Sequence, residues 1–210
     1  MARKGVIHKK VKPAKKKAPL PKLKIMVAST VYNFQDSLNQ ICAILNRSGF
    51  TVINSHLGTM KVDPRKSNLE NCLAAVEDCD LLFGIVRPFY GSGVINGKSI
   101  THCEISKAIE LDKPRWFVTH GDVTLARQLL QQYRYRGKYR NRKFRFKKTS
   151  VMDSIKVIDL YDEIVKSNVA PGKRRGNWNQ EYHTLEDILR YLETQFSDME
   201  RVRAIINDMK

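Results

Sequence analysis

The stretch DLLFGIVRPFYGSGVINGKSITHCEISKAIELDKPRWFVTH, residues 80–120, decides the fold. It opens with a continuous apolar run, DLLFGIV (80–86), which is typical of a strand buried on both faces. A Gly-rich loop (87–98) follows, and the segment after it carries apolar residues at helical spacing. PRWFVTH (114–120) then has the composition of another strand. Strand, helix and strand in this order predict two parallel strands in one sheet.

The chain before this stretch repeats the same alternation. KIMVAST (24–30) and FTVINS (50–55) are β-rich runs, and residues 34–49 and 67–80 show helical spacing. Ser67 with Glu70 three positions later predicts a capping box at the start of the second of these helices. Strands that alternate with helices predict a flavodoxin-like α/β fold, with a parallel sheet and helices on both faces. Such sheets bind ligands at the carboxyl ends of their strands.

The chain after residue 120 gives a weaker pattern. Residues 122–133 are helical in pattern, and residues 133–148 alternate aromatic and basic residues at both ends, which predicts a basic β-hairpin. A segment at 157–167 and a helix at 184–196 follow. We therefore expect three parts: a disordered basic arm at 1–22, an α/β domain at 23–120, and a C-terminal extension at 121–210 that packs on it.

Two segments carry the excess positive charge. The chain has 38 Lys and Arg against 21 Asp and Glu, a net charge of +17. Residues 1–24 hold ten of these cations and residues 134–148 hold nine, with no acid in either segment. Cations interleaved with aromatic residues bind nucleic acid through phosphate contacts and base stacking. The residues predicted to do so are Arg134, Arg136, Lys138, Arg140, Arg142, Lys143, Arg145 and Lys147.

Two other interpretations of the basic segment remain open. Its aromatic side chains can cover the core while its cations form a solvated face, and its partner can be an acidic protein instead of RNA or DNA.

Several classes of protein and site are not expected. No run of about 18 apolar residues predicts a membrane span, and no signal peptide begins the chain, so we expect a cytoplasmic protein. The four cysteines lie in apolar patterns without a CxxC pair, which favours buried thiols. The histidines lack the spacing of metal ligands, so neither a metal nor a separate cofactor is expected.

Polar residues cluster where the predicted strands end. Because carboxyl ends of parallel strands share one edge, these residues should converge there with the start of the third helix. From the strand ends they are Ser29, Thr30, Arg87, Tyr90, Gly91 and Ser92, and from the helix Ser99, Thr101, His102 and Glu104.

KIMVAST with the following FQDSL resembles the opening of a group of bacterial Toll/interleukin-receptor-like (TIR-like) domains. These domains are related to nucleoside deoxyribosyltransferases and often stand at the N-terminus of STAND-type signalling NTPases. FYGSG and GKSITHCEISKAIELDKP are similar to that group's glycine loop and third helix. The resemblance covers residues 24 to about 120, and the group has no settled activity.

The resemblance implies an N-glycosidase that cleaves the N-glycosidic bond of NAD or a related nucleotide, as an oligomeric effector in anti-phage defence. Related enzymes keep a carboxylate on the helix after the third strand, and Glu104 falls on that position. A carboxylate below the sugar stabilises or captures the oxocarbenium ion that forms when the bond breaks. The other polar residues of the predicted edge would then hold the substrate.

The sequence also departs from this pattern. Arg87 and Lys98 stand where deoxyribosyltransferases have aspartates, which favours a ligand that bears phosphate. His102 replaces an aromatic residue of the NAD-cleaving domains. The alternative function is a non-enzymatic module that self-associates and binds nucleic acid through its basic segments.

Overall fold

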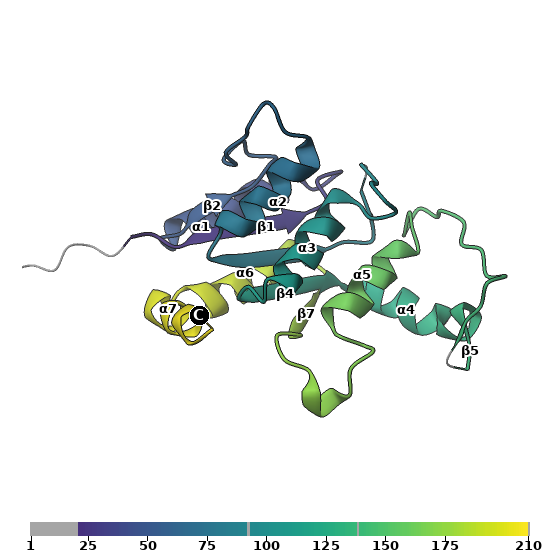
Figure 1. Ribbon diagram of the computed structural model, residues 1–210. Coiled ribbons are helices and arrows are strands. Elements are labelled where there is room, and N and C mark those ends of the chain that lie inside the picture. Colours follow the sequence, from purple (N-terminus) through teal and green to yellow (C-terminus); the bar gives the residue numbers. More distant parts are fainter. Residues whose placement is uncertain (1–20, 92, 138, 210) are drawn as a thin grey trace, which may run out of the picture.

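A five-stranded parallel sheet in the order β2–β1–β3–β4–β7 forms the centre of the protein (Figure 1). This order is that of the flavodoxin-like fold, so the predicted fold class is confirmed. The strands are β1 (Lys24–Ser29), β2 (Thr51–Ile53), β3 (Leu81–Val86), β4 (Arg115–His120) and β7 (Asn179–Tyr182).

The computed structural model describes residues 21–91, 93–137 and 139–209. The predicted basic arm therefore lies outside the described residues, except for Pro21 and Lys22. Ser92 and Lys138 also lie outside them. Within the described part, no helix is both long and apolar enough to cross a membrane.

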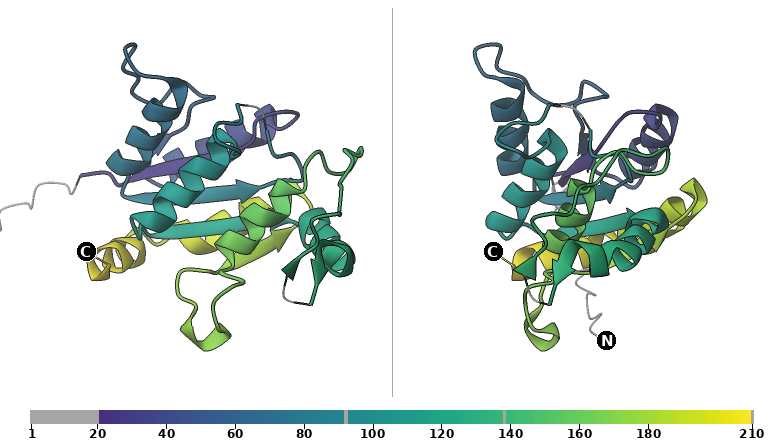
Figure 2. Two further views of the ribbon diagram at one scale, coloured as in Figure 1. Left: turned by 45° about the vertical axis from the view of Figure 1, so that its right-hand side comes forward. Right: turned by 90° about the vertical axis from the view of Figure 1, so that its right-hand side faces the viewer.

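Helices cover both faces of the sheet (Figure 2). One face packs against α1 (Gln35–Arg47), α6 (Leu185–Phe196) and α7 (Met199–Asp208). The other packs against α2 (Asn68–Asp78), α3 (Ile100–Glu110) and α5 (Lys156–Ile164), with α4 (Gly121–Arg134) beside α5.

The continuous apolar run of β3 follows from its central place. Leu81, Phe83 and Ile85 enter the core on the α1 side, while Leu82 and Val86 enter the core on the α3 side. A Cβ on Gly84, in the same strand, would lie 2.6 Å from the Phe117 ring. The absence of a side chain at this position therefore lets β4 fill the core beside β3.

The fifth strand comes from the segment that was predicted to be an extension. β7 pairs in parallel with β4, from Phe117 opposite Asn179 to His120 opposite Tyr182. Tyr182 and the apolar face of α6 also join the main core. The division predicted at residue 120 thus runs through the sheet, because residues 121–210 complete it rather than only pack on it.

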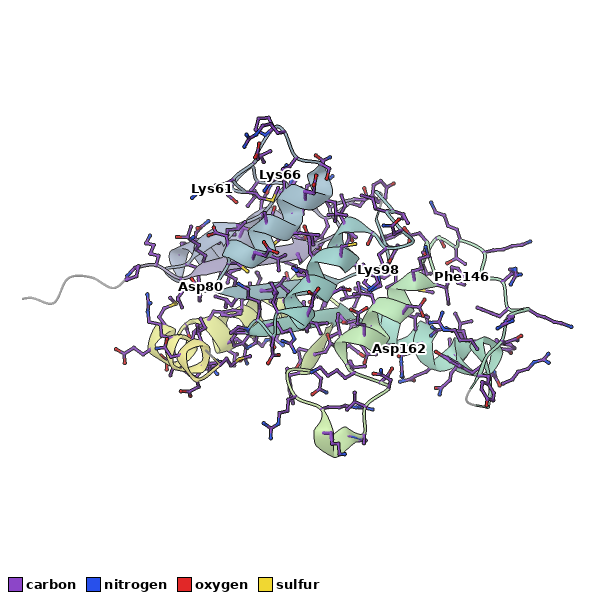
Figure 3. The ribbon with its side chains drawn as sticks, in the orientation of Figure 1. Lys61, Lys66, Asp80, Lys98, Phe146 and Asp162 are labelled. Atoms are coloured by element: carbon purple, nitrogen blue, oxygen red, sulfur yellow. The ribbon has the colours of Figure 1, made fainter. Side chains whose placement is uncertain are left out.

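The basic hairpin exists but is much shorter than predicted. Its strands are β5 (Tyr135–Arg136) and β6 (Tyr139–Arg140), paired antiparallel. The second alternating stretch, 144–147, contains no strand, and its Phe146 packs against the core on the α3 side (Figure 3). A short 3₁₀ helix, η1 (Pro171–Lys173), lies between α5 and β7.

Candidate functional site

A cavity of ≈ 480 Å³ opens at the carboxyl edge of the sheet, where β1 and β2 end and where α2 and α3 begin. Its volume falls in the range of about 300–1,000 Å³ that is typical of small-molecule sites. Hydroxyl and amide groups alternate with apolar side chains along its wall. Those used below are Ser29, Thr30, Tyr32, Met60, Val62, Asn71, Cys72, Gly91, Thr101 and Glu104.

Glu104 is the buried carboxyl group of this cavity. It lies in the second turn of α3 and is 5% exposed. Burial raises the pKa of its carboxyl to about 7, and a hydrogen bond with the Cys72 thiol opposes part of that rise. No cation of the described chain forms an ion pair with it. A buried carboxyl without a cation is costly to ionise, which makes it a candidate functional group.

The end of β1 supplies hydroxyl groups to the same cavity. The Ser29 hydroxyl donates to the Thr30 carbonyl at 3.1 Å. The Thr30 hydroxyl is buried and has no hydrogen-bond partner among the described residues. A Cβ on Gly91 would lie 2.9 Å from Thr30 Cγ2, and its φ of +88° favours glycine. The glycine loop can therefore approach the end of β1 closely.

The far wall of the cavity is built by α2 and the loop before it. Asn71 is buried, and its Nδ2 donates to the carbonyls of Asp63 and Ser67, each at 3.1 Å. The Asn71 Oδ1 accepts from the Asp63 N–H at 2.8 Å. These bonds fix the 63–67 loop against α2. Ser67 begins this helix in the predicted capping box with Glu70.

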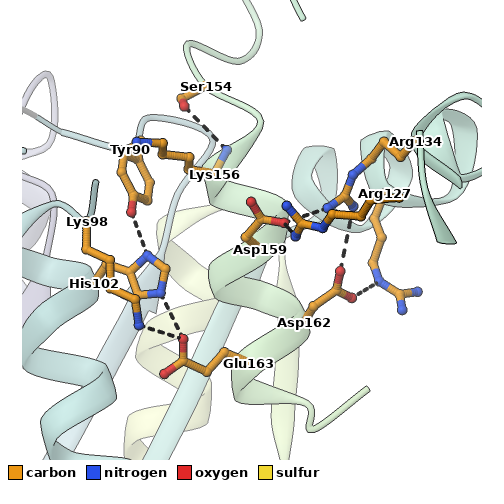
Figure 4. Close-up of polar contacts among 11 residues, drawn as sticks. Tyr90, Lys98, His102, Arg127, Arg134, Ser154, Lys156, Asp159, Asp162 and Glu163 are labelled. Carbon is orange, nitrogen blue, oxygen red and sulfur yellow. Dashed lines mark hydrogen bonds and ion pairs between the residues drawn. The ribbon is translucent and has the colours of Figure 1, made fainter. Parts of the chain in front are cut away.

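Three of the predicted substrate-binding residues lie away from the cavity, and Figure 4 shows two of them, Tyr90 and His102, in contact with each other. His102 is two positions from Glu104, about 200° around the helix. The Tyr90 hydroxyl contacts His102 Nδ1 at 2.6 Å and accepts from the Ser99 N–H at 3.2 Å. Tyr90, Ser99 and His102 are all buried and do not line the cavity. The structure thus corrects their expected place at the ligand.

This second group of side chains binds α3 to α5. Glu163 accepts from Ser106 at 2.6 Å and from Lys98 at 3.1 Å, and contacts His102 Nε2 at 2.9 Å. Burial acts to raise the Glu163 pKa, but bonds from His102 and Ser106, with the Lys98 charge, lower it to about 2. All its members are satisfied if His102 is neutral and carries its proton on Nε2. The group therefore clamps two helices together.

Arg87 braces the loop that follows β1 and does not reach the cavity wall. It is 8% exposed, and its Nη1 donates to the carbonyls of Thr30 at 3.2 Å and Tyr32 at 2.6 Å. Its guanidinium lies 4.5 Å from the centre of the Phe34 ring. The expected contact between Arg87 and a ligand phosphate is therefore not supported, because these N–H groups of the guanidinium already bind backbone carbonyls.

The basic segment is only partly available to a partner. Arg134 is buried, and its guanidinium pairs with Asp159 at 2.7 Å and Asp162 at 3.6 Å (Figure 4). Arg140 also pairs with Asp159. These two arginines therefore hold the hairpin to α5. The remaining described cations of the segment are exposed: Arg136, Arg142, Lys143, Arg145, Lys147 and Lys148.

The α2 side of the cavity was not predicted from the sequence. Cys72 was expected only as a core residue, and Asn71, Tyr32 and Met60 were not considered for the site. A polar Asn71 beside the apolar stripe of a helix was a usable signal, because a buried amide must find hydrogen-bond partners. Of the residues predicted at this edge, the cavity brings together Ser29, Thr30, Gly91, Thr101 and Glu104.

Other possible functional sites are less favourable than the cavity beside Glu104. A hollow of ≈ 440 Å³ between β7 and α6 has two carboxylates, Glu181 and Asp187, neither of which is buried. In the ranges that the structure describes, no three His, Cys, Asp or Glu side chains gather as metal ligands.

Comparison with known proteins gives one finding. The family model described as Domain of unknown function (DUF4062) matches residues 24–197. No curated protein and no solved structure gives a significant match. The match runs from β1 through α6 and so includes every strand of the central sheet. The chain therefore belongs to the DUF4062 family.

Proposed function

We propose that the protein is an N-glycosidase that cleaves the N-glycosidic bond of NAD or of a related nucleotide. The observation that carries the proposal is Glu104, a buried carboxyl without a cationic partner in a cavity at the carboxyl edge of the sheet. Structures rarely retain such a group, because burial penalises its charged form. Its retention at a ligand-binding edge favours a catalytic role.

For NAD, the reaction requires one carboxylate and one water molecule. The C1′–N bond breaks and the nitrogen leaves with the electron pair, so the nicotinamide of NAD departs neutral. Positive charge develops at C1′, where the Glu104 carboxylate stabilises or captures it. Water then bonds to C1′ and loses a proton, which leaves a free ribosyl product and a restored carboxylate.

The rest of the cavity suits a nucleotide. The hydroxyl groups of Ser29, Thr30 and Thr101 are of the kind that bind ribose hydroxyls, and the Thr30 hydroxyl lacks another partner. Tyr32, Met60 and Val62 offer apolar surface to the base. This mixture of apolar walls and a few polar groups is usual for small-molecule sites.

The pKa of Glu104 predicts the pH dependence. Its carboxyl has a pKa of about 7 in the free protein. Since the carboxylate is the reactive form, kcat/KM should rise with pH up to about 7 and then level off. A cationic nicotinamide ring bound in the cavity would favour the carboxylate form of Glu104 and so lower its pKa in the complex. The rise of kcat should therefore occur at lower pH than the rise of kcat/KM.

The test is release of free base from NAD and mixed nucleotides by wild type, Glu104→Gln and Glu110→Gln, followed by mass spectrometry. Glu110 is exposed near the end of the same helix, so its variant makes the same chemical change outside the cavity. Wild type and Glu110→Gln should turn over, and Glu104→Gln should be slower by about 10³-fold or more. Equal turnover by Glu104→Gln would refute the proposal, as would the absence of both turnover and nucleotide binding.

A second candidate function is a nucleic-acid-binding module. The observation in its favour is the group of exposed cations after α4, especially Arg142 and Lys143. Fluorescence anisotropy with labelled single-stranded RNA should show binding that weakens steeply with salt. Arg142→Gln/Lys143→Gln should weaken it, whereas Lys61→Gln/Lys66→Gln, in the distant loop before α2, should not (Figure 3). Equal losses in both variants would leave only a non-specific charge effect.

A further inference from the structure

The outward face of α4 displays a row of apolar side chains. Leu125, Leu129 and Tyr133 are 54%, 61% and 56% exposed. Residues four positions apart lie above one another on a helix, so these three form a continuous row over three turns. Val123 on the same helix is buried in the core and anchors α4 to the sheet. The row is therefore additional to the face that folds the protein.

The exposed residues of α4 also include no cation. Besides the apolar row, the exposed residues of this fully described helix are Gln128, Gln131 and Gln132. Asp122 in the first turn adds one carboxylate to this side, with a side chain that is 43% exposed beside His120. The segment directly after α4, in contrast, is rich in arginine and lysine. A partner of this face thus meets apolar and amide groups rather than cations.

We propose that this face, formed by Leu125, Gln128, Leu129, Gln132 and Tyr133, binds the same face of a second copy of the chain. A second copy brings another net charge of +17, so self-association needs a surface that is free of cations. Glutamine amides both donate and accept hydrogen bonds, which makes this face complementary to itself. A two-fold axis beside Leu129 would place Leu125 against Tyr133 of the second copy.

Electrostatics favours the antiparallel arrangement of the two helices. α4 has 14 residues and is therefore about 21 Å long. The basic segment follows its C-terminal end, so antiparallel helices hold the two basic segments at opposite ends. That separation exceeds the Debye length of about 8 Å at physiological ionic strength. Parallel helices would instead bring the two basic segments side by side.

The position of α4 leaves the face open and makes the contact weak. In Figures 1 and 2, α4 and β5 lie at one end of the molecule and α7 at the other. One helix pair of this length is small beside the interfaces of roughly 1,200 Å² and more that are typical of stable complexes, so a weak contact is expected. Assembly should thus depend on local concentration. This inference does not rest on the proposed function.

Sedimentation equilibrium of the nuclease-treated full chain in high salt tests the contact. The average mass should rise above 24.3 kDa towards twice that value as concentration rises. Leu129→Glu should weaken association at least tenfold, because it places a charge at the centre of the face. Gln131→Glu adds the same charge about 200° around the helix and should leave association unchanged. Circular dichroism checks that both variants fold.

Disulfide crosslinking tests the orientation. Leu129→Cys should crosslink with itself, whereas Leu125→Cys and Tyr133→Cys should crosslink efficiently only when the two variants are mixed. A monomer at every concentration, or a complex that nuclease dissolves, would overturn the proposal. Self-crosslinking of Leu125→Cys and of Tyr133→Cys would mean parallel helices and would also overturn the proposal. Crosslinking of these cysteines to another segment of the same chain would overturn it as well.

Discussion

The two sides of α3 hold two glutamates in opposite environments. Glu104 is buried beside the cavity with one thiol as its hydrogen-bond donor, and its pKa is raised to about 7. Glu163, which reaches the other side from α5, is bonded by His102, Ser106 and Lys98, and its pKa is lowered to about 2. Burial raises the pKa of both carboxyls, so the difference between the two pKa values comes from the donors around each carboxyl. The comparison indicates that one side of the helix is built for stability, and that the other leaves its carboxyl uncompensated.

Removing the charge of Glu104 should have the largest effect on stability. Between pH 4.5 and 7 the folded protein holds a proton on Glu104 that the unfolded chain has lost, so stability falls as pH rises through this window. The full loss is about 3 kcal/mol. Glu104→Gln should abolish this fall and be more stable than wild type at pH 8, as measured by urea unfolding at several pH values. A variant less stable than wild type at pH 8 would show that the charged carboxylate is compensated.

Replacing Glu163 by glutamine should have the opposite effect on the stability of the fold. Its lowered pKa stabilises the fold above pH 4.5, and this contribution is lost as pH falls towards 2. Because about a third of the side chain is exposed, we expect about 2 kcal/mol rather than the full value. Glu163→Gln should therefore be less stable than wild type at pH 7 and equal to it near pH 2, in urea titrations. A constant difference at all pH values would assign the loss to packing alone.

Loss of the Tyr90 hydroxyl should have a smaller effect without pH dependence. Tyr90→Phe removes the bonds to His102 Nδ1 and to the Ser99 N–H, which should cost about 1 kcal/mol. The fall in stability between pH 4.5 and 7 should persist, because Glu104 lies on the other side of the helix. If this window shifted in the urea series, the two sides of α3 would be coupled.

Changes to the hydrogen bond from Cys72 to Glu104 should have the smallest effect on stability. A hydroxyl donates more strongly than a thiol, so Cys72→Ser should lower the Glu104 pKa, with a change in stability below about 1 kcal/mol. Cys72→Ala removes the donor and should raise that pKa. The midpoint of the pH-dependent fall in stability measures both shifts, and equal midpoints would exclude a role for this contact.

The local patterns of the sequence predicted the fold better than the site. The apolar run of β3 and the capping box of Ser67 and Glu70 are signals within a few residues, and both were correct. β7 was missed because NQEY is four residues long, polar and at the edge of the sheet, with no alternation to reveal it. Its pairing with β4 is determined by contacts that are distant in sequence.

Prediction of the site failed where distant residues decide the environment. Glu104 and Thr30 were placed at the carboxyl edge from the order of strands and helices alone. His102 looked equivalent to Glu104, because the sequence does not show that Glu163, 61 positions later, takes its Nε2. Arg87 looked like a phosphate ligand because its carbonyl partners are also far away, at 55 and more positions.

The late position of β7 has a consequence for synthesis on the ribosome. The open edge of β4 stays unpaired until about 60 further residues have been translated, which takes about 3–12 s at usual rates. During this time the nascent chain exposes a strand edge that can pair wrongly. The α3–α5 clamp also waits for Glu163, so α3 can be fixed against α5 only after the 61 positions between His102 and Glu163 have been translated.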